Sequence, residues 1–317
     1  VADAASAMRA WPEAHLVLVG VDLATQVAQV RPQRRDAVYV VSAGPVEDHL
    51  FRVALELGAE SVLDLARGAS WLAQVLSDLA DPRPVGSVLA VMPGSGGAGA
   101  TTLACALGQV AARHGPSLVL DLDPGGPGVD RVLGMDGEPG LGWEALAATS
   151  GRLSGSALRE SVPRQGGVGV LTWGHPVPDE PAVEVLRETL QAAARGHDLV
   201  VVDLPRGAGQ VSEEVVARSD RVLLVVRPTL TGLAAARRQL AALDGRGGLV
   251  LRGRGLDADV VADTVGAPVL AEMADQARLQ ESVDLGLGPV RGRRGPLVRA
   301  AAELLAGVSG SPVRSRA

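Results

Sequence analysis

The sequence predicts an α/β protein in which a doubly wound, mostly parallel sheet follows a smaller α/β domain. Three observations lead to this prediction. Short, continuously apolar runs alternate with helical stretches over residues 87–306, which is typical of parallel strands buried on both faces. A glycine-rich stretch, residues 94–99, lies between the first of these runs and a helical pattern. Two prolines in Asp81-Pro82-Arg83-Pro84 mark a boundary between this region and a shorter α/β pattern before it.

Composition and charge narrow the classes of function. Of the 317 residues, 47% are hydrophobic and 21% are charged, which indicates globular domains. The net charge of −6 and the aromatic content of 2% argue against a nucleic-acid-binding surface. The single cysteine, Cys105, excludes an intrachain disulfide, and the five histidines show no spacing of metal ligands. No apolar run reaches the ~18–20 residues that span a bilayer, so no integral membrane segment is expected.

An amino-terminal domain is expected over residues 1–82. Its helical pattern from Val53 to Leu57 is expected to end at Gly58, because glycine commonly terminates helices. Strand-like runs lie at Leu16–Val19, Val38–Val41 and Ser61–Leu63. The chain begins at Val1 rather than at methionine, which leaves room for an upstream segment.

The order of these elements resembles the later part of a receiver domain of the response-regulator type. The phosphorylated aspartate of a receiver would end the first of these strands, where this chain has Gly20, with Asp22 two residues later. A receiver would also use a lysine near its last strand, but all 30 basic residues of this chain are arginine. Ser42 does lie where the switch hydroxyl would be. The resemblance therefore implies a degenerate receiver-like module without phosphotransfer.

The second domain is expected over residues 87–306, after a short, stiff linker at residues 83–86. Its last helix is expected to run from Pro296 to Leu305, with proline in the favoured first turn and Gly307 just beyond the end. Residues 307–317 are expected to be a disordered tail. The expected strands are Val88–Val91, Leu118–Leu120, Val168–Leu171, Leu199–Val202, Val222–Val226, Leu249–Leu251 and Val269–Leu270.

The glycine-rich stretch has the frame of a phosphate-binding loop, but it lacks two lysines. A working loop of this type reads Lys-Gly-Gly-x-Gly-Lys-Thr-Thr, and here Ser95 and Ala100 replace the two lysines. The glycines still allow backbone N–H groups to converge on a phosphate at a helix N-terminus. The charge that reaches the outer phosphates is missing. A tight strand–helix turn that binds nothing is the alternative interpretation.

Carboxylates follow two of the expected strands. Asp121-Leu122-Asp123 follows the second strand, and Asp203 follows the fourth. The carboxyl ends of parallel strands meet at one edge of a sheet, where such groups handle Mg²⁺ and water. One of Asp121 and Asp123 could instead be a hydrogen-bonded turn residue.

In order and spacing, these segments resemble the MinD/ParA family of deviant Walker-A ATPases over residues 87–306. With the receiver-like module, the chain looks most like the CpaE/TadZ branch, and closer still like its actinobacterial subgroup labelled septum site-determining proteins. The resemblance implies Mg-ATP or ADP as a cofactor, although the missing lysines leave its binding open. It also implies homodimers, formed across an interface that the lysine at the Ser95 position would cross.

The resemblance assigns roles to single residues. Phosphates would contact the loop and the start of its helix, at Gly96, Gly97, Gly99, Ala100, Thr101 and Thr102. Thr101 would hold Mg²⁺, Asp121 and Asp203 would hold it through water, and Asp123 would orient the attacking water. Arg206 and Arg227 follow strand ends and could replace the missing charge, with a different geometry from lysine. In the segment Arg252-Gly253-Arg254, related sequences usually carry an asparagine that reads adenine.

These features favour a degenerate regulator over an enzyme. It would act in the cytoplasm through partners of the division, pilus or secretion machinery, at the septum or a pole, with weak or no ATP hydrolysis. One alternative is an active ATPase with lysine-free phosphate binding. A lower alternative is a ParA-like DNA partitioning factor, for which Arg291-Gly292-Arg293-Arg294 is the densest basic cluster.

Overall fold

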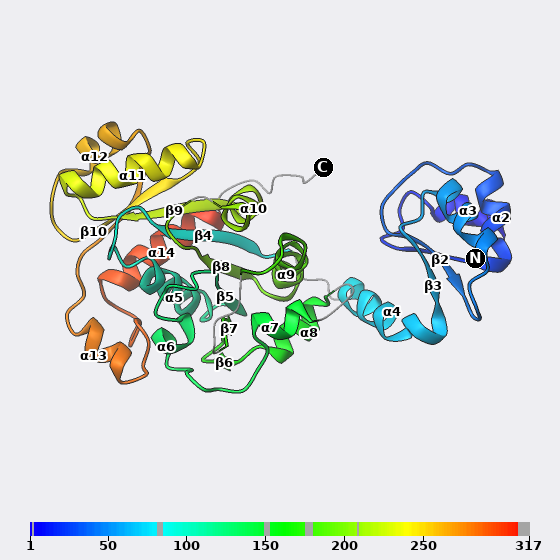
Figure 1. The fold of residues 1–317 in the computed structure, drawn as a ribbon, viewed down its shortest axis with the longest axis horizontal. Coiled ribbons are helices and arrows are strands. Elements are labelled where there is room, and N and C mark those ends of the chain that lie inside the picture. Colours follow the sequence, from blue (N-terminus) through cyan, green and yellow to red (C-terminus); the bar gives the residue numbers. More distant parts are fainter. Residues whose placement is uncertain (2, 81–84, 149–152, 175–179, 208, 310–317) are drawn as a thin grey trace. The chain divides into compact units, whose positions relative to one another are not determined.

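The computed structural model describes residues 1, 3–80, 85–148, 153–174, 180–207 and 209–309. The chain divides into two compact units, Val1–Pro82 and Arg83–Ala317. Residues 83–84 of the expected linker and residues 310–317 of the expected tail lie outside the described residues. Each unit is described by itself below (Figure 1).

The first unit has a three-stranded parallel sheet in the order β1-β2-β3. All three expected strands and the helix that ends at Gly58 are confirmed, and Gly58 adopts φ 68°, which favours glycine. A core that includes Trp11, Val38 and Leu57 packs between the helices and the sheet. The elements are α1 (Ala4–Ala10), β1 (Val17–Gly20), α2 (Val21–Gln29), β2 (Val38–Ser42), α3 (Asp48–Leu57), β3 (Ser61–Asp64) and α4 (Leu65–Ala80).

The second unit has an eight-stranded sheet in the order β11-β10-β9-β4-β8-β5-β7-β6, which confirms the doubly wound fold. All seven expected strands are present, and every pair is parallel except the short added pair β6·β7. The strands are β4 (Ser87–Pro93), β5 (Ser117–Asp121), β6 (Arg164–Gln165), β7 (Val168–Leu171), β8 (Leu199–Asp203), β9 (Arg221–Val226), β10 (Gly248–Arg252) and β11 (Val269–Met273).

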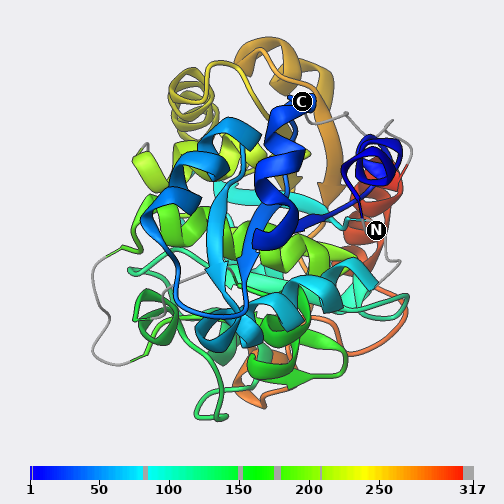
Figure 2. The ribbon, with the colours of Figure 1, turned by 90° about the vertical axis from the view of Figure 1, so that its right-hand side faces the viewer.

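Helices cover both faces of this sheet (Figures 1 and 2). Along β4, Ala90 and Met92 join one apolar cluster while Leu89 and Val91 join another, as the alternation of a strand requires. Helices α5 and α14 pack on the second of these clusters, and α9 to α12 pack on the first. The helices are α5 (Ala100–Ala111), α6 (Val129–Leu133), α7 (Trp143–Ala147), α8 (Gly155–Ser161), α9 (Val183–Gly196), α10 (Gln210–Arg218), α11 (Leu230–Ala242), α12 (Ala258–Val265), α13 (Leu279–Asp284) and α14 (Pro296–Ser309).

The expected end of the last helix is wrong. Helix α14 continues through Gly307 to Ser309, so the domain does not stop at residue 306 and the tail does not begin at 307. The side chain of Arg221, at the start of β9, donates a hydrogen bond of 2.7 Å to the carbonyl oxygen of Gly307. A cation on a carbonyl near a helix C-terminus stabilises the last turn and offsets the low helix propensity of glycine.

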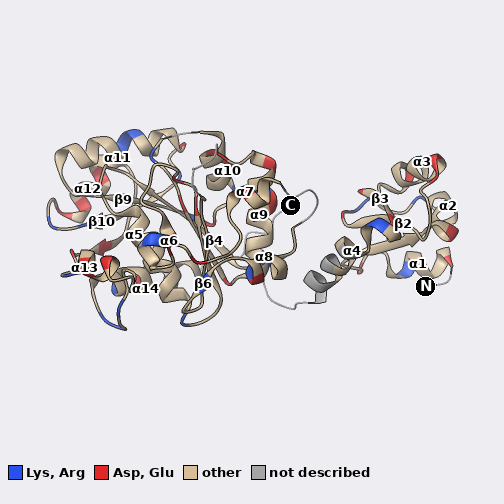
Figure 3. Ribbon diagram, turned by 60° about the horizontal axis from the view of Figure 1, so that its bottom comes forward, with Lys and Arg blue, Asp and Glu red and all other residues tan. Residues whose placement is uncertain are grey.

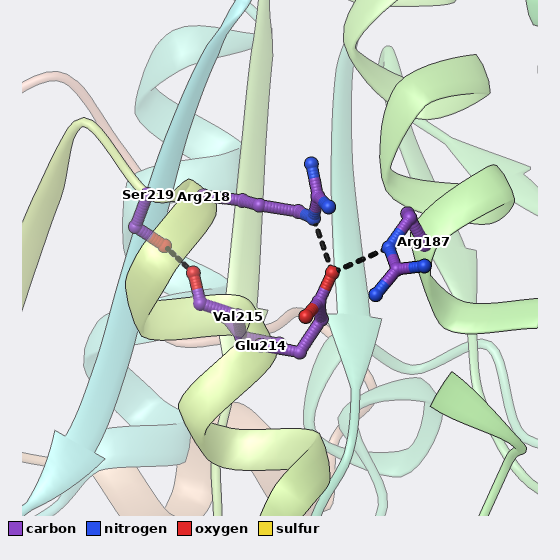
Figure 4. Close-up of polar contacts among 5 residues, drawn as sticks. All are labelled: Arg187, Glu214, Val215, Arg218 and Ser219. Carbon is purple, nitrogen blue, oxygen red and sulfur yellow. Dashed lines mark hydrogen bonds and ion pairs between the residues drawn. The ribbon is translucent and has the colours of Figure 1, made fainter. Parts of the chain in front are cut away.

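Two arginines on neighbouring helices share one carboxylate (Figure 4). Nε of Arg187, on α9, lies 2.7 Å from Oε1 of Glu214, on α10, and Nε of Arg218 donates to the same oxygen from one turn further along α10. These hydrogen bonds, first that from Arg187 and then that from Arg218, lower the pKa of Glu214 from 4.5 to about 2. The carboxylate therefore ties α10 to α9 over one face of the sheet.

We predict that Glu214→Gln lowers the melting temperature of the protein by a few degrees at pH 7. A carboxyl whose pKa is lowered on folding stabilises the fold above its unfolded pKa, and this contribution is lost as the pH falls from 4.5 towards 2. Thermal melts at pH 7 and pH 3 should therefore show a smaller difference between variant and wild type at pH 3. Glu213→Gln, at an exposed position of the same helix, is the control. Equal effects of both variants would contradict the prediction.

Candidate nucleotide site

The glycine-rich stretch forms a loop between β4 and α5, at the carboxyl edge of the sheet. Gly97 and Gly99 adopt φ values of 66° and 92°, which only glycine adopts without strain. The N–H of Gly94 donates to the carbonyl oxygen of Val225 on β9, and the N–H of Ala98 donates to that of Ser95. The first bond fixes the start of the loop against the sheet, and the second closes a turn within the loop.

The loop leaves backbone donors free. Gly96 and Gly97 are exposed, and a Cβ atom on Gly97 would meet no atom within 4 Å. Within the part of the chain that the structure describes, the N–H groups of Gly96, Gly97 and Gly99 donate to no protein acceptor. Thr101 and Thr102 lie in the first turn of α5, where backbone N–H groups have no acceptor in their own helix. The geometry is suited to an anion above the loop.

The two positions that lack lysine are both buried. Ser95 is 7% exposed, and its hydroxyl accepts a long hydrogen bond of 3.4 Å from the N–H of Arg227. Ala100 is 5% exposed and belongs to the apolar cluster that contains Leu103. Neither side chain can deliver charge to the loop. The loop thus keeps its backbone shape while both positions contribute to packing.

Asp121 is a buried carboxylate with its hydrogen-bonding capacity largely satisfied. Its Oδ1 accepts from the N–H of Asp123 at 3.1 Å, and its Oδ2 accepts from the N–H of Val129 at 3.1 Å and the hydroxyl of Thr172 at 2.9 Å. Burial raises the pKa of Asp121 despite these bonds. The Asp121 carboxylate therefore organises the turn after β5 as well as facing the site.

Asp203 is the partner of Asp121 in the register of β5 and β8, and it is 2% exposed. Its Oδ1 has no hydrogen-bond partner among the described residues, while its carboxyl group accepts from the Thr101 hydroxyl. Burial, and then the charges of Asp121 and Asp123, raise the pKa of Asp203 well above its usual value. A buried carboxyl oxygen without a partner is costly, so the site is complete only with a proton or a further ligand.

Asp123 has a different environment from the two buried carboxylates. It is half-buried, and its Oδ1 accepts from the N–H of Gly125 at 3.1 Å in the turn after β5. Its carboxylate thus caps a turn, as expected for one member of the Asp121/Asp123 pair. A catalytic role for Asp123 stays a prediction.

Two arginines flank the loop. Nη1 of Arg252, at the end of β10, donates to the carbonyl oxygen of Ala98 at 3.2 Å, and Nε lies 3.2 Å from Oδ1 of Asp275. Nη1 of Arg206 would lie 3.9 Å from a Cβ atom on Gly96. Arg227, in contrast, reaches the loop through its backbone N–H. The sequence suggested Arg206 and Arg227, whereas the loop contact of Arg252 was not foreseen, although its place at a strand end could have indicated it.

A hollow of about 240 Å³, which includes open solvent, lies beside the loop. It is lined by Gly99, Thr102 and Arg252 on one side and by residues such as Gln276 and Leu279 on the other. Arg252 crosses its edge between the loop and Asp275. The hollow extends the exposed loop into a small groove.

In the first unit, the residues at the positions of a receiver's phosphorylation site take part in local turns and helix starts. Gly20 ends β1 and caps α2, and Asp22 lies in the first turn of α2. The Ser42 hydroxyl donates to the carbonyl oxygen of Gly44 at 2.8 Å and is 5% exposed. Ser42 therefore closes its own turn.

Comparison with known proteins gives the family. A family model described as "Rv3660c-like, CheY-like N-terminal domain" matches residues 1–87. The uncharacterized protein Rv3660c of Mycobacterium tuberculosis is 34% identical over 313 residues, which cover 95% of this chain and 87% of the relative. The chain belongs to the Rv3660c-like family.

Solved structures show that the second unit has the MinD/ParA fold. The septum site-determining protein MinD of Pyrococcus horikoshii, complexed with Mg-ADP, has a TM-score of 0.60 at 18% identity, over 71% of this chain and 96% of that one. MinD in the MinC:MinD complex of Aquifex aeolicus has a TM-score of 0.58 at 19% identity, over 73% and 98%. The comparisons do not show the CpaE/TadZ branch, which stays a prediction.

The residues of the site fit a magnesium ion bound with a nucleotide. The described residues include no cluster of three His, Cys, Asp or Glu that could hold a metal alone. Mg²⁺ in nucleotide sites, however, takes one or two protein oxygens, with phosphates and water as the rest. The partnerless oxygen of Asp203 and the Thr101 hydroxyl supply such oxygens, and Asp121 faces the same edge.

We predict that Asp203→Asn raises the melting temperature of the ligand-free protein by several degrees at pH 8. A carboxyl group whose pKa is raised on folding destabilises the folded state as the pH rises from the unfolded pKa through the folded pKa. The stability that the amide adds should therefore be smaller in acid. A neutral amide removes a buried charge whose unsatisfied oxygen costs roughly 1–3 kcal/mol.

The control is Asp121→Asn, which places an amide N–H₂ against backbone donors and should destabilise the protein. Thermal melts between pH 5 and pH 8 measure both variants. A loss of stability in Asp203→Asn at pH 8 would contradict the account of a strained carboxylate.

We also predict that Ala100→Lys binds Mg-ATP about tenfold more tightly than wild type. The new ammonium would extend along the loop from a backbone that already has the required shape, and a charge-assisted hydrogen bond contributes about 1.5–3 kcal/mol. Ala100→Met, of similar length without charge, should show no gain. Calorimetric titration of folded variants measures this, and equal affinities in all three proteins would mean that the loop is not shaped for phosphate.

Proposed function

We propose that this protein is a degenerate MinD-like regulator that acts through protein contacts, with weak or no ATP hydrolysis. The observation that carries this proposal is a complete phosphate-loop backbone in which both lysine positions hold buried, uncharged residues, Ser95 and Ala100. Phosphoryl transfer depends on positioning and on charge stabilisation of the outer phosphates. A site that can position the phosphates but lacks its usual cations is better suited to binding a nucleotide than to hydrolysing it.

A nucleotide, as Mg-ATP or ADP, is the proposed ligand of the loop. The free N–H groups of Gly96, Gly97 and Gly99 and the open oxygen of Asp203 support it. The structurally similar MinD of Pyrococcus horikoshii is complexed with Mg-ADP. Gly96, Gly97, Gly99 and Ala100, together with Thr102, would surround the phosphates. In this proposal, occupancy of the loop would order the edge of the sheet and control self-association into a homodimer.

The proposed partners are proteins of the division machinery or of a pilus or secretion apparatus. The MinD of Aquifex aeolicus forms a MinC:MinD complex, which supports partner binding through this fold. No helix in the described ranges is both long and apolar enough to cross a membrane. We propose that the protein works in the cytoplasm and reaches a septum or pole by protein contact, with the receiver-like unit as the recruiting surface.

One observation favours a second candidate, an active ATPase with lysine-free phosphate binding. Arg206 and Arg252 both approach the loop, so positive charge is present near the phosphates. Two facts weigh against this candidate. Arginine differs from lysine in geometry, and Arg252 already forms an ion pair with Asp275. A DNA partitioning factor is less well supported, because the net charge is −6 and acidic and basic residues are scattered along the ribbon (Figure 3).

We predict that the purified full chain hydrolyses Mg-ATP at a negligible rate. Removing one preorganised donor from a site that stabilises developing charge costs about 10²–10³ in rate, and two cations are missing here. Steady-state phosphate release measures this, with Asp123→Ala as the control for contaminating activity. Turnover within tenfold of an ordinary MinD-like enzyme, lost in Asp123→Ala, would select the active ATPase.

Imaging of the full chain, fused to a fluorescent protein in its own host, tests the regulatory part. Discrete foci at a septum or pole are expected. A uniform distribution would contradict a positioning function, and salt-sensitive foci on the nucleoid would select the DNA partitioning alternative.

A further inference from the structure

Arg206 is placed where the phosphate loop lacks charge. It follows Asp203 by three residues in the segment that leaves β8, the strand beside β4 in the sheet. A Cβ atom on Gly96 would lie 3.9 Å from its Nη1, and no other atom would lie within 4 Å of that position. The guanidinium group of Arg206 therefore lies beside the exposed part of the loop.

The charge of Arg206 is not used inside the protein. Arg206 is exposed, and across the described ranges it forms no ion pair and no hydrogen bond with another residue. Arg252, the other arginine at the loop, is bound to Asp275 and to the carbonyl oxygen of Ala98. Arg252 thus holds the loop, whereas Arg206 keeps its full set of donors for a ligand.

The groups around Arg206 suit a phosphate rather than a carboxylate of the protein. The N–H groups of Gly96 and Gly97 are free to bind an anion. A Cβ atom on Gly97 would meet no atom within 4 Å, so there is room for a ligand beside the loop. Asp203 is 2% exposed, and its Oδ1 has no hydrogen-bond partner among the described residues. The same edge of the sheet therefore holds a buried acceptor that is not satisfied. A magnesium-bound polyphosphate would supply both an anion for the loop and a cation for the carboxylate.

We propose that Arg206 supplies the positive charge that the loop lacks, by binding the outer phosphate oxygens of a nucleoside di- or triphosphate. This inference rests on the proposed nucleotide binding at the same site. The charge comes from the end of β8, whereas a phosphate-loop lysine would come from the loop itself. A guanidinium can donate two parallel hydrogen bonds to a phosphate, so a single arginine fixes both position and orientation.

The test compares Arg206→Ala with Arg227→Ala in the full chain. Arg227 is an exposed arginine after the adjacent strand β9, and it contacts the loop through its backbone, which the substitution preserves. Calorimetric titrations with Mg-ATP, Mg-ADP and Mg-free AMP give the affinities. We expect Arg206→Ala to weaken Mg-ATP binding at least tenfold, since a hydrogen bond to a charged group is lost. Arg227→Ala should stay within about twofold of wild type, the agreement expected of a change outside the site.

Arg206→Lys separates charge from structure. A lysine at this position should restore part of the Mg-ATP affinity, while the melting temperature without nucleotide should be the same in all variants. A loss caused by misfolding would instead lower the melting temperature and would not be rescued.

Three results would overturn the inference. They are unchanged Mg-ATP affinity in Arg206→Ala, an equal loss in Arg227→Ala, and no binding of Mg-ATP to the wild type. The first two leave the proposed regulatory function in place, because nucleotide still binds. Failure of that function would appear separately, as a uniform distribution of the fluorescent full chain in cells.

Discussion

The register of β8 against its neighbours β4 and β5 determines the rest of the site. It pairs Val91 with Asp203 on one side and Asp121 with Asp203 on the other. Because all three strands are parallel, the phosphate loop after β4 and both carboxylates meet at one edge. A shift of one residue in β8 would turn Asp203 to the opposite face of the sheet.

This constraint carries a cost in stability. The folded chain holds Asp121 and Asp203 as neighbours at a buried edge, where burial raises the pKa of both and the charge of Asp121 raises the pKa of Asp203 further. Asp121 is compensated by backbone and Thr172 donors, whereas one oxygen of Asp203 is not. A chain that had abandoned ligands altogether would gain stability from an amide or apolar residue at position 203. Either a proton or a bound cation at Asp203 would remove this cost.

Much of the fold could be predicted from the sequence, because parallel strands buried on both faces leave a continuous apolar signal. The run Val222–Val226 and the glycine at position 58 are examples in which local chemistry determined the outcome. The end of α14 could not be predicted, since it depends on Arg221, a residue 86 positions away that binds the Gly307 carbonyl. The short strand β6 has two exposed residues and no apolar pattern to reveal it.

The candidate site was predictable as a set of positions and not as a set of contacts. Spacing along the chain placed the loop and Asp203 together, because strand order and parallel direction follow from the alternating pattern. Which arginine approaches the loop depends on side-chain directions at three strand ends. Arg206 and Arg252 bring side-chain atoms to the loop, whereas Arg227 contacts it through its backbone N–H, although all three lie at or just beyond the ends of strands. The partnerless oxygen of Asp203 is likewise visible only in three dimensions.

We propose that this loop binds a magnesium polyphosphate without lysine. The most direct measurement is a calorimetric titration of the purified full-length wild-type chain with Mg-ATP, repeated with AMP and with Mg-ATP in 0.5 M salt. We expect saturable binding of one Mg-ATP per chain, weakened by salt, and no measurable binding of AMP. Absence of heat with Mg-ATP at millimolar concentration, or equal binding of ATP and AMP, would contradict it.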